Sequence, residues 1–106
     1  MKRGDVVIMA AAGDYGKPPP AVIVQTDAFP ESHASVVVCP MTSDIVEAPD
    51  FRVTIHPSER NGFKGALANH GDIPVTVRRS RIGQPIGQLD DGDVGRLNIA
   101  LSLWLS

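Results

Sequence analysis

Three short stretches of the sequence carry side chains that could bind an anion. The first is GDYGK at residues 13–17, where a turn would present an aspartate, a tyrosine and a lysine. The second is PMTSD at residues 40–44, whose hydroxyls could donate hydrogen bonds from the end of a strand. The third is RRSR at residues 78–81, a cluster of three guanidinium groups. Each has a structural alternative, because glycines mark turns, hydroxyls cap turns and charged residues cover solvated faces.

Other catalytic patterns are absent from the sequence. The histidines, His33, His56 and His70, are scattered and form no HxxxH or HExxH motif. There is no phosphate-binding P-loop and no Gly-x-Ser-x-Gly elbow. The single cysteine, Cys39, lies in an apolar run and is expected to be a small core residue. We therefore expect no metal site, no cofactor and no disulfide.

Composition indicates an ordinary globular chain. It has 106 residues, of which 42% are hydrophobic and 21% charged, so disorder is not expected. We expect one domain over residues 1–106. Its apolar runs are too short to span a membrane, and its start shows no signal-peptide pattern. With a lone cysteine, the expected compartment is the cytoplasm. The net charge of −2 argues against general affinity for nucleic acid, yet the arginine cluster leaves room for a local basic surface.

The elements that must position these stretches are mostly strands. Short β-branched or alternating runs predict six of them, at residues 5–12, 21–25, 35–39, 51–55, 74–78 and 82–88. We expect Pro40 to close the third strand. Strands this short, separated by glycine and proline turns, favour a small curled sheet or barrel.

The hydrophobic period changes to that of a helix at the C-terminus. Asp90 or Asp91 can cap this helix, and Asp93 suits its positive end. One face carries Val94, Leu97, Leu101 and Trp104. A wider apolar surface comes from Ile99, Leu103 and Leu105. The helix is therefore expected either to pack on the core of a monomer or to contribute to a dimer contact.

The motifs taken in order resemble the MazF/PemK (Kid) family of toxin endoribonucleases. They are KRGDVV at 2–7, GDYGK at 13–17, PAVIVQTD at 20–27, VVVCPMTSD at 36–44, FRVTI at 51–55, NGFK at 61–64 and RRSRIGQPIGQLDD at 78–91. This resemblance covers nearly the whole chain. It implies a mainly β fold with a C-terminal α-helix, a small SH3-like β-barrel of the CcdB/MazF type, paired as a homodimer. It also implies a toxin that cuts single-stranded RNA without a metal and is silenced by a cognate antitoxin.

The family site maps onto this chain with one serious departure. Metal-free RNA cleavage uses the 2′-OH as nucleophile and needs a base, an acid and donors for the phosphorane. In the family, a Thr or Ser ending the third strand helps bind the phosphate, and this position matches Thr42, with Ser43 beside it. The family's phosphate-binding arginine falls on Pro19, which has neither charge nor donor. Because losing one such donor costs on the order of 10²–10³ in rate, we expect a weakened or inactive nuclease.

RNA specificity in such a site would come from splayed bases and stacking. Tyr15 is the candidate for stacking, and Asp14 and Asp72 could accept hydrogen bonds from base edges. The candidate contacts to the RNA backbone are Lys17, Arg78 and Arg79.

A second departure lies in GALANHG at residues 65–71, where the resemblance implies an apolar strand. These residues have poor strand propensity, so we expect a weakly packed strand there.

Two functional alternatives stay open. One is a non-catalytic CcdB-like toxin that binds DNA gyrase through its C-terminal helix. The other is a small structural barrel in which Thr42 and the arginines have no role in nucleic-acid binding.

Overall fold

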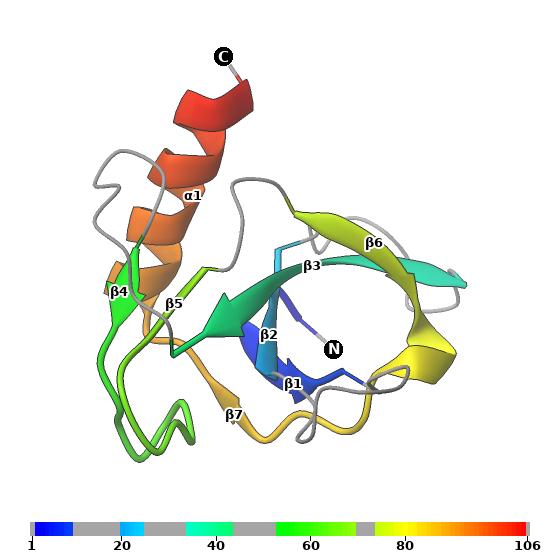
Figure 1. Ribbon diagram of the computed structural model, residues 1–106, viewed down its shortest axis with the longest axis horizontal. Coiled ribbons are helices and arrows are strands. Elements are labelled where there is room, and N and C mark those ends of the chain that lie inside the picture. The colour runs from blue at the N-terminus through cyan, green and yellow to red at the C-terminus, as the bar shows by residue number, and fades with distance from the viewer. Residues whose placement is uncertain (1, 10–19, 25–33, 44–52, 70–73, 106) are drawn as a thin grey trace.

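The computed structural model describes residues 2–9, 20–24, 34–43, 53–69 and 74–105 (Figure 1). Within these residues the chain forms seven strands, one 3-10 turn and one helix. The strands are β1 (Asp5–Ile8), β2 (Pro20–Ile23), β3 (Ser35–Thr42), β4 (Thr54–Ile55), β5 (Leu67–Asn69), β6 (Val75–Arg78) and β7 (Gly87–Gln88). The 3-10 turn is η1 (Arg79–Arg81), and the helix is α1 (Asp91–Leu105). The expected mainly β fold with a C-terminal helix is confirmed.

The strands pair in the order β4-β5-β3-β2-β1-β7, and every pairing is antiparallel. The long strand β3 is the centre of this curled sheet (Figure 1). One edge of β3 pairs with β2, while the other edge is shared by β6 near its start and β5 near its end. The two ends of β3 therefore have different neighbours, which decides the surroundings of the candidate site.

The prediction that Pro40 closes the third strand is wrong, because β3 continues to Thr42. The oxygen of Val37 accepts a hydrogen bond from Val24 after β2, so odd-numbered residues of β3 direct their polar groups toward β2. The nitrogen of Pro40 therefore points to the other edge. There it lies between Met41, which pairs with β5, and Val38, which pairs with β6. Proline has no backbone N–H, but at Pro40 this removes no hydrogen bond from either the β3–β5 or the β3–β6 ladder.

The expected strand at residues 82–88 is also mostly wrong, since only Gly87–Gln88 is a strand. Ile82 forms an isolated bridge with Met9, whereas Gly87 pairs with Val6. Between these two pairs, the β1 side advances by three residues, from Val6 to Met9, whereas the facing segment advances by five, from Ile82 to Gly87. The two extra residues interrupt the ladder, as in a bulge.

The remaining strands form where they were expected, but most are shorter. β1 ends at Ile8, and residues 10–12 of the expected strand lie outside the described residues, as do residues 51–52 before β4. The strand expected at 21–25 begins one residue earlier, at Pro20, and ends at Ile23. The weak segment at 65–71 does form β5 over three residues, and Ala68 in it is completely buried.

Strand alternation divides the apolar side chains between two faces of the sheet. On one face Val6, Val22 and Cys39 belong to a cluster that α1 covers with Leu97 and Leu101. The other face carries a second, smaller cluster of Val7, Ala21, Ile23, Val36 and Val38. The central strands β1, β2 and β3 are thus buried on both sides, which explains their nearly continuous apolar runs.

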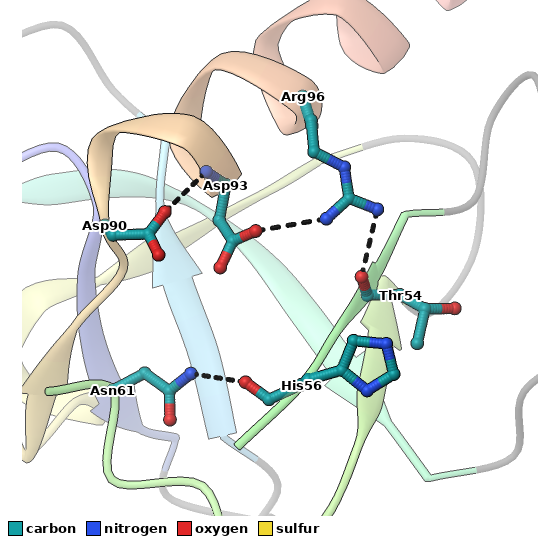
Figure 2. A network of polar contacts seen from close by, with 6 residues as sticks. All are labelled: Thr54, His56, Asn61, Asp90, Asp93 and Arg96. Atoms are coloured by element: carbon teal, nitrogen blue, oxygen red, sulfur yellow. Dashed lines mark hydrogen bonds and ion pairs between the residues drawn. The ribbon is translucent and has the colours of Figure 1, made fainter. Parts of the chain in front are cut away.

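Of the two caps proposed for the helix, Asp90 is the one observed. Its Oδ1 accepts a hydrogen bond from the backbone N–H of Asp93 at 2.8 Å (Figure 2). The guanidinium of Arg96 bonds both the carboxylate of Asp93 at 3.0 Å and the carbonyl oxygen of Thr54 at 3.1 Å, which ties α1 to β4 (Figure 2). Ile99 is 64% exposed in the single chain. The side chain of Trp104 lies outside the described part.

Candidate functional site

Thr42 and Ser43 stand where β3 ends. Thr42 is half-buried and lies directly opposite Ala68 of β5, and Ser43 follows it as an exposed residue. Ala68 in turn pairs with Thr54 of β4, so the three residues form one row across three strands. Paired residues in an antiparallel sheet have Cβ atoms about 4.5–5.5 Å apart. The small side chain of Ala68 therefore borders Thr42 directly, a neighbour that sequence reasoning missed because pairing register is not a local property.

The start of β2 lies at this same end of β3. Ala21 pairs with Pro40, so the strand enters the sheet beside the residues that precede Thr42. Pro20 is the first residue of β2. Pro19, the residue before it in the sequence, lies outside the described residues. The start of β2 and the end of β3, to which Thr42 belongs, therefore lie at one end of the sheet.

The arginine cluster lies at the opposite end of β3. Arg78 pairs with Ser35, the first residue of β3, while Thr42 is the last. Seven residue steps separate these positions, which corresponds to about 23 Å along a strand. Arg78 is exposed and Arg79, in the 3-10 turn, is half-buried. Within one chain, the structure does not bring these two candidate RNA-binding residues together with Thr42 and Ser43.

The other candidate residues were predicted to bind RNA bases or the RNA backbone. They are Asp14, Tyr15, Lys17 and Asp72, and all lie outside the described residues. Their roles, like those of Thr42, Ser43, Arg78 and Arg79, stay predictions.

A polar residue that sequence reasoning did not single out is Asn61, which is 2% exposed. Its side-chain oxygen accepts hydrogen bonds from the backbone N–H groups of Ser58 and Phe63, at 3.0 and 2.9 Å. Its amide donates to the carbonyl of His56 at 2.9 Å (Figure 2). These bonds shape the connection from β4 to β5. The sequence signal for this role is weak, since an Asn-Gly pair predicts only a turn.

The described residues contain no group of three or more His, Cys, Asp or Glu side chains that could hold a metal ion. Cys39 is buried, as expected, and burial raises the pKa of its thiol from 9.0 to about 11. It is therefore a neutral core residue near neutral pH. Across the described residues, no helix is long and apolar enough to cross a membrane.

Comparison with known proteins decides the family. Residues 2–105 match the model of the PemK-like, MazF-like toxins of type II toxin–antitoxin systems. The chain belongs to this family. A curated relative of this toxin, from Mycolicibacterium smegmatis, is named probable endoribonuclease MazF. It is 38% identical over 106 residues, covering 99% of this chain and 96% of the relative.

Solved structures confirm the fold of this MazF-like toxin. A mycobacterial endoribonuclease in complex with its cognate antitoxin matches with a TM-score of 0.77 and 23% identity, over 99% of this chain and 94% of that one. The Mycobacterium tuberculosis toxin MazF-mt6 matches with a TM-score of 0.78 and 19% identity, over 95% of each chain. MazE-MazF from Deinococcus radiodurans matches with a TM-score of 0.77 and 20% identity, over 99% of this chain and 95% of that one. The identification made from sequence motifs is thus confirmed, and with it the assignment to an endoribonuclease toxin family.

Proposed function

We propose that this toxin cleaves single-stranded RNA by attack of a 2′-OH on the adjacent phosphodiester, without a metal or other cofactor. In that reaction the 2′-oxygen forms a bond to phosphorus as its proton passes to a base. The bond from phosphorus to the 5′-oxygen breaks, and that oxygen takes a proton from an acid. The products are a 2′,3′-cyclic phosphate and a 5′-hydroxyl. Groups that donate hydrogen bonds to the phosphorane accelerate the step.

The observation that supports this proposal is the meeting of Thr42, Ser43 and the start of β2 at one end of the sheet. The hydroxyls of Thr42 and Ser43 can donate to phosphate oxygens there. An arginine at position 19 would add a charged fork that fits two of these oxygens. Pro19 supplies neither the charge nor the donors. We therefore propose that this copy of the toxin is weakened at the chemical step while its fold is kept.

The same proposal extends to the partners of the toxin. The described relatives include an endoribonuclease with its cognate antitoxin and a MazE-MazF complex, which support an antitoxin partner here. We place residues 1–106 in one toxin domain, paired as a homodimer and acting on RNA in the cytoplasm. Asp14, Tyr15, Lys17 and Asp72 are proposed to contact the RNA as the sequence predicts.

The test is incubation of the purified protein with a long RNA in EDTA. We expect slow or no cleavage by the natural chain, and cuts with cyclic-phosphate ends by the Pro19→Arg variant. The rate should rise by about 10²–10³-fold, the typical effect of one preorganised donor. Cleavage by the natural chain at the rate of the variant would refute the weakening. Intact RNA with both proteins, together with inhibition of DNA gyrase, would replace the nuclease by the gyrase-binding alternative.

A further inference from the structure

Two arginines of the cluster, Arg79 and Arg81, belong to the 3-10 turn η1, and backbone hydrogen bonds connect this turn to the segments beside it. The backbone N–H of Arg79 donates to Ala34, just before β3, at 3.0 Å. Ile82 donates back to Arg79 at 3.1 Å, and Gly83 donates to Ile8 of β1 at 3.0 Å. The turn is thereby held between the start of β3 and the end of β1. Because its backbone is fixed before any ligand arrives, an arginine here loses less freedom on binding than one on an open loop.

Arg78 and Arg81 are the two members of the cluster whose side chains are exposed. Arg60 and Arg96 are exposed as well, but the side chain of each has a described partner. Arg96 forms an ion pair with Asp93, and Arg60 bonds the side chain of Gln88 at 3.2 Å. They lie elsewhere, on α1 and on the connection from β4 to β5, whereas β6 and the turn after it occupy the other side of the molecule (Figure 1). In a chain of net charge −2, Arg78 and Arg81 thus place two exposed guanidinium groups within four residues of each other, while the exposed Lys2, Arg60, Lys64 and Arg96 lie on other segments.

The distance along β3 decides what this charge can contact. Arg78 pairs with Ser35 at the start of β3, and Thr42 lies at the end of β3, about 23 Å away when measured along the strand. A phosphate bound by Thr42 is therefore separated from Arg78 by the length of β3. One phosphodiester group cannot reach both ends. In a strand whose bases stay stacked at about 3.4 Å per nucleotide, the same span corresponds to about seven nucleotides, and splayed bases need fewer.

We infer that Arg78 and Arg81 bind phosphodiester groups of the RNA several nucleotides away from the bond that is cut, and so extend the RNA footprint beyond the cleavage centre. This inference rests on the proposed RNA substrate. Arginine suits the role because its planar guanidinium matches two phosphate oxygens. Such contacts strengthen binding and set the position of the strand, but they take no part in the chemical step.

Binding at different salt concentrations tests the contacts. The probe is an RNA of about 16 nucleotides with 2′-O-methyl groups, which lacks the nucleophile. Each phosphate contact to a single strand contributes about 0.7 to the slope of log affinity against log salt. The Arg78→Gln/Arg81→Gln variant should therefore lose about 1.4 of slope. Between about 50 and 200 mM salt, the parent should lose about sevenfold more affinity than this variant. The matched Arg60→Gln/Arg96→Gln variant removes the same net charge and should keep the parental slope.

Substrate length tests the distance. In the Pro19→Arg background, the same pair of substitutions should raise KM on the RNA of about 16 nucleotides and leave kcat unchanged. On an RNA trimmed to one nucleotide on each side of the cut, it should change neither constant. Equal losses on both lengths would overturn the inference, because the arginines would then act at the scissile phosphate, for example across a dimer. Circular dichroism verifies that each variant is folded.

The outcomes separate this inference from the proposed function. If neither the parent nor the Pro19→Arg variant binds or cuts RNA, the proposed function fails and this inference fails with it. If both bind RNA and the slope is the same with and without Arg78 and Arg81, only the inference fails.

Discussion

Thr42 and Ala68 lie directly opposite each other across the β3–β5 ladder, and Ala68 is completely buried between Thr42 and Thr54. The hydroxyl proposed to bind the scissile phosphate is therefore flanked by the smallest chiral side chain, in a strand of only three residues. Thr54 occupies the equivalent place on the far side of Ala68. The row offers two threonines in similar strand settings, of which only Thr42 stands beside the start of β2.

This row supports a prediction on catalysis. In the Pro19→Arg background, Thr42→Val should lower kcat for RNA cleavage by about 10²–10³-fold, since valine keeps the shape and strand preference of threonine but loses the hydroxyl. The control is Thr54→Val, which should leave kcat unchanged. A Thr42→Val protein that cuts RNA at the rate of its parent would remove Thr42 from the site.

Asn61 supports a prediction on stability. Asn61→Ala removes the acceptor of the Ser58 and Phe63 N–H groups and the donor to His56. Because the bond to Phe63 is buried, we expect the free energy of unfolding to fall by roughly 1–3 kcal/mol, measured by chemical denaturation. Ser58→Ala removes a single acceptor, that of the Asn61 N–H, and should cost less. Equal effects of the two substitutions would show that the side chain of Asn61 does not hold this connection.

Gly87 and Gly65 differ in the space available for a side chain, so their alanine variants make a matched pair. A Cβ on Gly87 would overlap the carbonyl oxygen of Asn61 and lie 2.7 Å from that of Arg60, whereas a Cβ on Gly65 would meet nothing within 4 Å. Gly87→Ala should therefore separate β7 from this connection and destabilise the fold by more than about 1 kcal/mol. Gly65→Ala should be neutral or raise the free energy of unfolding by up to about 1 kcal/mol, because it restricts the unfolded chain. Thermal denaturation of both variants checks the order.

Cys39 supports a prediction on pH. Burial raises the pKa of its thiol from 9.0 to about 11. Above pH 9 the unfolded chain loses this proton while the folded chain keeps it. The free energy of unfolding should therefore fall as the pH rises from about 9 to 11, by roughly 2–3 kcal/mol in all, and show no such contribution below pH 9.

The Cys39→Ala variant is the control for that prediction. Below pH 9 it has a lower stability, but it lacks this part of the pH dependence, so the difference between the two curves isolates the thiol. Native Cys39 should also resist iodoacetamide at pH 8 and react once the chain is unfolded. Parallel curves for the two proteins between pH 9 and 11 would contradict the assignment.

The sequence by itself determined the local features of this protein. The β-branched runs predict the central strands, and Asp90 with the 3.6-residue period predicts the C-terminal helix, because capping and amphipathic spacing are local properties. The family was also readable, since its motifs are short and occur in order. The same motifs predict that Pro19 stands at the position of the family's arginine.

Only the tertiary structure decided which residues come together. β3 passes through Pro40 because its neighbours on that edge change between β5 and β6 at this level. The register places Ala68 beside Thr42, and it separates Thr42 from Arg78 by the length of β3. Asn61 is buried because the connection from β4 to β5 folds against β7. Strand pairing joins residues far apart in the chain, so neither propensity nor spacing contains this information.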